Sequence, residues 1–204
     1  MRGLHGHASL LAVLLGAFLL SGCATRGTIS EPEIEPAVRR ATLEAIDHWE
    51  ARGRIALKTP DANGQGNFAW TQTGERAVLR LSGPFGASAY EIRWEPARLT
   101  VLSKDGEVTA DYAGPDAAER FLHEQLGWSL PVANTRHWLL GLAGPGSPAI
   151  ETKDASGLLA GLTQDGWQVR YDEYRPQDGI AMPRKLVFES AAGRIRLVID
   201  AWQL

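Results

Sequence analysis

The 204-residue sequence contains a single cysteine, Cys23, which excludes an internal disulfide, a Cys-x-x-Cys redox pair and any metal site built from several cysteines. It also lacks a strong excess of either charge. Twenty-one basic and 24 acidic residues give a formal net charge of −3, so nothing favours nucleic acid as a partner. Hydrophobic residues make up 44% and charged residues 22%, which is typical of one folded domain.

Recognisable catalytic motifs are missing as well. His123-Glu124 begins like the zinc-protease pattern, but Gly127 stands where the second histidine is required. Gly86-Ala87-Ser88 begins like a nucleophile elbow, yet the second glycine is absent and a strand rather than a helix is expected to follow. Neither a Walker loop nor a dinucleotide fingerprint is present. We therefore expect a protein that is not an enzyme and that binds neither a metal ion nor a dissociable cofactor.

The longest apolar run is short, extending only from Leu10 to Leu20. Eleven residues are too few for a bilayer span, which needs about 20, but fit the apolar region of an export signal. The run ends in Leu20-Ser-Gly-Cys23, which resembles a bacterial lipobox; an ordinary secretory signal that happens to end near a cysteine is the alternative. We predict that residues 1–22 are a signal peptide and that Cys23 is acylated, carrying a diacylglyceryl group and an N-linked acyl chain such as palmitate. Ala24 replaces the aspartate that resembles an inner-membrane retention mark, so we expect the periplasmic face of the outer membrane of a Gram-negative bacterium.

The rest of the chain divides into a tether and one domain. Residues 23–36 contain prolines and glutamates without apolar periodicity, which indicates an extended, lipid-anchored tether, and residues 37–204 form the domain. A helix is predicted to start at Pro36, to carry Trp49 on its apolar face and to end near Gly53. Short alternating strands follow, interrupted by two helices near 116–126 and 134–142.

This order predicts an α+β, mainly β fold: a curved antiparallel sheet that forms an incomplete barrel, with a helical lid over an apolar cavity. A packed core without a cavity has the same periodicity, so both possibilities remain open. The alternating face supplies most of the candidate cavity residues and the second helix supplies the others: Phe68, Trp70, Leu79, Leu81, Tyr90, Ile92, Leu99, Val101, Trp138, Leu139 and Leu142.

One connection between strands has an unusual tip. In Gly83-Pro84-Phe85-Gly86 an aromatic ring stands where small polar residues are normal. Phe85 either folds back onto the core or enters another apolar medium, such as a membrane.

Several motifs taken together are similar to the LolB family of outer-membrane lipoprotein receptors. They are the lipobox, the connection Gly83–Gly86, the segment Arg136-His-Trp-Leu-Leu-Gly-Leu-Ala-Gly144, and Ala181-Met-Pro183. The resemblance runs in order from Trp49 to the end of the sequence. It departs at Phe85, where the family commonly has leucine.

The resemblance implies a receptor that accepts acylated lipoproteins from the soluble periplasmic carrier LolA and inserts them into the inner leaflet of the outer membrane. It implies that Gly83, Pro84, Phe85 and Gly86 form a membrane insertion loop and that acyl chains occupy the cavity. The expected partners are LolA, acylated cargo and outer-membrane phospholipid, with the protein a monomer. The alternative function is a lipid-anchored structural or assembly protein of the outer membrane without a lipid cavity.

Overall fold

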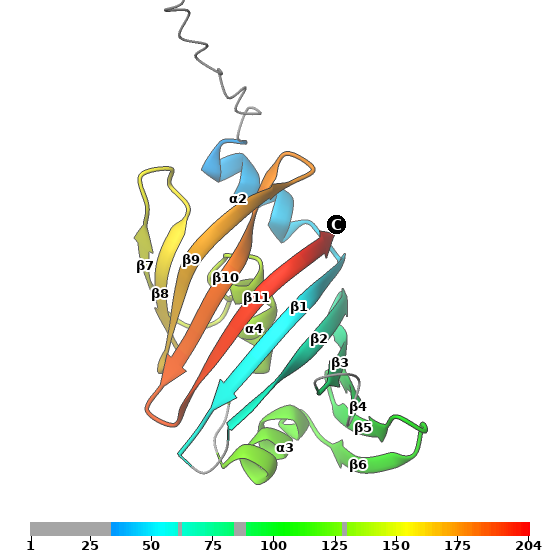
Figure 1. The fold of residues 1–204 in the computed structure, drawn as a ribbon. Coiled ribbons are helices and arrows are strands. Elements are labelled where there is room, and N and C mark those ends of the chain that lie inside the picture. Colours follow the sequence, from blue (N-terminus) through cyan, green and yellow to red (C-terminus); the bar gives the residue numbers. More distant parts are fainter. Residues whose placement is uncertain (1–33, 61–62, 84–88, 128–129) are drawn as a thin grey trace, which may run out of the picture. The chain divides into compact units, whose positions relative to one another are not determined.

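The computed structural model describes residues 34–60, 63–83, 89–127 and 130–204. Cys23 and the residues Pro84, Phe85 and Gly86 lie outside this described part, whereas Gly83 lies within it, half-buried just after a strand. In the described residues, eleven strands form one antiparallel sheet in the order β6-β5-β4-β3-β2-β1-β11-β10-β9-β8-β7 (Figure 1).

The elements follow one another along the chain as helix, six strands, two helices and five strands. Their bounds are α2 Pro36–Glu44, β1 His48–Lys58, β2 Asn63–Thr73, β3 Arg76–Ser82, β4 Ala89–Glu95, β5 Arg98–Ser103, β6 Val108–Ala113, α3 Ala117–Leu126, α4 Val132–Leu139, β7 Ala149–Lys153, β8 Leu159–Gln164, β9 Trp167–Gln177, β10 Ile180–Ser190 and β11 Gly193–Gln203.

The two halves of the sheet meet at β1 and β11, which lie side by side in Figure 1, cyan against red. Because β6 and β7 are the two outer strands and do not pair with each other, the barrel stays open. The main core packs against the inner face of the sheet, where α4 contributes Trp138 and Leu139. The predicted fold, an incomplete antiparallel barrel with helices covering its apolar face, is confirmed.

The first helix is shorter than the periodicity predicts. It ends at Glu44, and Trp49 belongs to β1, where its ring is 1% exposed and stacks on Trp70 with ring centroids 6.1 Å apart. Helix and strand periods coincide over a few residues, and the long pairing of β1 with β2 and β11 decides between them here. The prediction that a helix continues to Gly53 is therefore wrong.

Gly53 instead lies in the middle of β1, at a bulge in the pairing with β11. A Cβ atom at this position would stand 2.0 Å from the carbonyl oxygen of Val198, because the two backbones approach closely there. We expect Gly53→Ala to lower the free energy of unfolding by at least ~2 kcal/mol, since the backbones must separate. Gly64, which has no atom within 4 Å of its position for a Cβ, is the matched control.

Denaturant unfolding of the two glycine variants measures this difference. Gly64→Ala should leave the free energy of unfolding within about 0.5 kcal/mol of the value for the parent protein. Similar midpoints for the two variants would contradict the close approach at Gly53.

Candidate functional site: an apolar cavity under the helices

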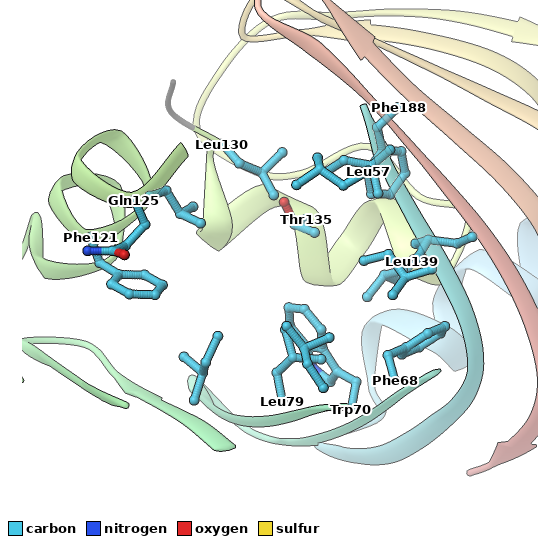
Figure 2. A pocket seen from close by; sticks show the side chains of 16 residues that line it. Leu57, Phe68, Trp70, Leu79, Phe121, Gln125, Leu130, Thr135, Leu139 and Phe188 are labelled. Atoms are coloured by element: carbon cyan, nitrogen blue, oxygen red, sulfur yellow. The ribbon is translucent and has the colours of Figure 1, made fainter. Parts of the chain in front are cut away.

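A cavity of about 250 Å³ lies between the inner face of the sheet and helices α3 and α4. Figure 2 shows Phe68, Trp70 and Leu79 from the strands facing Phe121 of α3 and Leu139 of α4. All the lining residues but two have apolar side chains: Ile55, Leu57, Phe68, Trp70, Leu79, Leu81, Ile92, Phe121, Leu122, Gln125, Leu130, Thr135, Leu139, Phe188, Ile195 and Leu197. The apolar lining suits an aliphatic chain.

The cavity has a smaller neighbour of about 90 Å³. Both spaces share Trp70, Leu79, Phe121 and Leu130, and the smaller one extends to Leu99. The apolar surface therefore continues from beneath α4 towards strands β4 and β5 under α3.

The polar groups of the cavity wall offer little for chemistry. The hydroxyl of Thr135 donates to the carbonyl oxygen of Pro131 at 3.0 Å, which satisfies it within α4. Burial, followed by the nearby Arg136 charge, lowers the pKa of His137 on the same helix to about 4, so this side chain is neutral at physiological pH. Within the described ranges, no group of three or more His, Cys, Asp or Glu side chains is arranged to hold a metal ion. The arrangement favours binding of apolar groups rather than catalysis.

The structure distributes the candidate cavity residues over several environments. Six line the larger cavity: Phe68, Trp70, Leu79, Leu81, Ile92 and Leu139. Leu99 lines the smaller cavity, and Val101 packs beside it against Ala117 and Ala118 of α3. Trp138 and Leu142 belong to the packed core instead, and Tyr90 is 46% exposed.

Trp138 belongs to the core because hydrogen bonds turn it away from the cavity. Its indole N–H donates to Oε1 of Gln164 at 2.8 Å, and its carbonyl oxygen accepts from the hydroxyl of Tyr171 at 2.9 Å. Its ring also meets Phe188 edge-on, at a centroid distance of 5.9 Å. These contacts fix α4 to the strands, so this helix is a firm wall of the cavity.

Sequence reasoning missed the cavity residues of β1, β11 and α3. Ile55 and Leu57, like Ile195 and Leu197, alternate with charged or small residues, so the signal for an inward face was present in both strands. Phe121 and Leu122 lie on the apolar side of α3, which also carried a readable signal. Which inward residues leave empty space between them depends on packing across the sheet.

Helix α3 is held mainly by strands β5 and β6. The hydroxyl of Tyr112 on β6 donates to the Glu124 carboxylate at 2.5 Å, and the Tyr112 ring meets Phe121 edge-on.

Among the described segments, no helix combines the length and the hydrophobicity that a membrane-spanning helix requires.

The family described as "Outer membrane lipoprotein LolB" matches residues 47–202. A relative from Nitrosococcus oceani, named outer-membrane lipoprotein LolB, is 35% identical over 199 residues, which cover 96% of this chain and 97% of the relative. A relative of the same name from Pseudomonas aeruginosa is 36% identical over 91% of each chain.

The fold has a counterpart among solved structures. A DUF1329 family protein from Desulfovibrio piger superposes with a TM-score of 0.52 at 8% identity, covering 82% of this chain and 90% of that one, which shows a shared fold only. The family match and the two relatives, by contrast, span most of the sequence. The chain therefore belongs to the LolB family of outer-membrane lipoproteins and is not an enzyme.

Proposed function

We propose that this protein receives acylated lipoproteins from the periplasmic carrier LolA and inserts them into the inner leaflet of the outer membrane. The observation that carries the proposal is the cavity of about 250 Å³, whose lining is apolar except for Gln125 and Thr135. An acyl chain is the part of a lipoprotein that such a space accommodates.

Energetics explain why a protein is needed for this transfer. Exposing an acyl chain of about fifteen methylenes to water costs ~12 kcal/mol at ~0.8 kcal/mol per methylene. Cargo with three such chains would leave a carrier far too slowly through the aqueous periplasm. Transfer from one apolar cavity to the next avoids this cost. Small differences in affinity then set the direction without nucleotide hydrolysis.

Two parts of the proposal concern Cys23 and the connection Gly83–Gly86, of which only Gly83 lies within the described ranges. Acylated Cys23 would anchor the chain, and two or three acyl chains make such an anchor effectively permanent. The connection Gly83-Pro84-Phe85-Gly86 would enter the bilayer through the Phe85 ring and complete the apolar route at its membrane end. The lipobox and the unusual turn composition support these assignments.

The alternative function, a structural or assembly lipoprotein, calls for a packed interior. The empty volume under α3 and α4 favours the receptor instead, because an unfilled apolar space destabilises a protein unless a ligand occupies it.

A cavity-filling substitution tests the receptor function. Leu79 lines both cavities, whereas its neighbour Val78 faces the other side of β3. We expect Leu79→Trp to weaken binding of a fluorescent acylated peptide about tenfold, because the indole displaces roughly two methylenes of the chain from the cavity. Val78→Trp is the matched control and should bind like the parent protein.

Fluorescence titration of the full chain in detergent-free vesicles measures the affinities. Equal affinities for Leu79→Trp and Val78→Trp would exclude this cavity as the acyl-chain site. Absence of binding to the parent protein would support the structural alternative.

A further inference from the structure

Tyr90 continues the wall of the cavity to the protein surface. Cross-strand pairing places Phe68 opposite Leu81 and Leu81 opposite Tyr90, so the three side chains form one row on the inner face. Phe68 and Leu81 line the cavity and Phe68 is 5% exposed, whereas Tyr90 is 46% exposed. The row therefore leads from a dry interior to an exposed aromatic ring.

A second exposed apolar side chain lies at the same end of the sheet. Tyr90 pairs with Ser103 across β4 and β5, and Leu102 pairs with Val108 on β6. Val108 is 61% exposed. Lys104, between them in the turn from β5 to β6, is also exposed. We name Tyr90, Lys104 and Val108 the β4–β6 corner.

The composition of the β4–β6 corner matches the interfacial region of a bilayer. Tyrosine is enriched at that level because its ring is apolar and its hydroxyl polar, and lysine extends its ammonium group to the headgroups. In the described part of the chain, four large hydrophobic residues are exposed: Val38, Tyr90, Val108 and Ile150. Val38 lies on α2 and Ile150 on the opposite outer strand β7, so they provide matched controls.

The charges around the corner are balanced. Asp105 and Glu107 both follow Lys104 in the turn. On the other face of the sheet, Arg80 and Arg93 both pair with the Glu91 carboxylate, at 2.8 and 2.7 Å. Attraction to an anionic surface therefore contributes little, and apolar contact with a zwitterionic phospholipid surface is the fitting interaction.

We propose that the β4–β6 corner lies in the phospholipid headgroup region, and that Tyr90 bridges the cavity wall at Leu81 to the lipid during cargo release. This proposal rests on the proposed function and assigns a membrane contact to residues outside the 83–86 connection. Membership of the LolB family supports it, because a protein anchored to the outer membrane has a bilayer within reach.

Site-specific labelling tests the position of the corner. A fluorophore is attached at Val108→Cys, Ile150→Cys or Val38→Cys in the full chain, where the proposed lipid would block the thiol of Cys23, the single native cysteine. The chains are reconstituted into zwitterionic vesicles with nitroxide-labelled headgroups. We expect quenching at position 108 to exceed that at 150 and 38 by roughly threefold, with little change at high salt. Equal quenching at the three positions would overturn the proposal.

Cargo release tests the role of Tyr90. We expect Tyr90→Ser to slow delivery to vesicles about fivefold, whereas Tyr90→Phe and Ile150→Ser deliver normally, because the ring supplies the apolar contact. If Phe85→Glu blocks delivery but Tyr90→Ser does not, the bridge is wrong and the receptor function stands. If the parent protein neither binds nor delivers acylated cargo, the receptor function itself fails.

Discussion

Phe85→Glu should reduce delivery of lipoprotein from this protein to vesicles on the order of a hundredfold. The substitution removes the ring, which is worth ~2–3 kcal/mol on entering an apolar medium, and adds a carboxylate that is costly to place near the acyl chains. Uptake of cargo from the carrier should be unchanged, because the described residues that line the cavity lie mainly on the strands and on helices α3 and α4. Separate assays of uptake and delivery measure the two steps.

Phe85→Leu is the control for this prediction. It preserves an apolar side chain of the kind that the LolB family commonly has at this position, so delivery should stay within a few-fold of the parent rate. Normal delivery by Phe85→Glu would show that the ring does not enter the membrane. Loss of uptake as well as delivery would place Phe85 in cargo binding instead.

Gln164→Leu should cause the largest loss of stability among the substitutions considered. Gln164 is 1% exposed. Its Oε1 accepts from Trp138 and from the backbone N–H of Gly144, and its Nε2 donates to the carbonyl oxygens of Gly144 and Ser147. Leucine leaves these four groups without this partner, three of them buried and the Ser147 carbonyl part-buried, at about 1 kcal/mol each. We therefore expect a loss of ~3–4 kcal/mol and a fall in Tm of roughly 10 °C.

Gln168→Leu is the matched control, because Gln168 is an exposed glutamine on the neighbouring strand β9. Its Tm should change by no more than about 2 °C. Calorimetry of the vesicle-bound full chain measures both values. Equal Tm values for the two variants would mean that the Gln164 hydrogen bonds do not hold α4 and its following loop to the sheet.

The alternating pattern was sufficient to predict most of the strands. Leu79 and Leu81, separated by Arg80, lie on one face of β3, as period two requires. The same alternation begins at Trp167 in β9 and at Ile195 in β11. Strands β7 and β8 lack a clear alternation, because the first is a short edge strand with exposed Ile150 and the second contains Gly161.

The interior of the site depended on contacts that the local sequence does not encode. Nothing near Trp138 indicates that Gln164, 26 residues away, accepts from its indole and holds it in the core. Tyr90 follows the same period as Ile92 but stands at the end of its row, opposite the polar Ser103, and is 46% exposed. Periodicity predicts the face of a residue; its exposure depends on what lies beside it.

The position of β11 has a consequence for the biogenesis of the protein. The last strand of the described chain pairs with the first and joins the two halves of the sheet. During export the early strands can form hairpins, but the continuous sheet can form only after β11 is available to pair with β1. Pairing between strands so far apart in the sequence is slow. A chain that is still emerging into the periplasm therefore has no complete cavity, and the proposed binding of acyl chains can begin only after β11 has been translocated and has paired with β1.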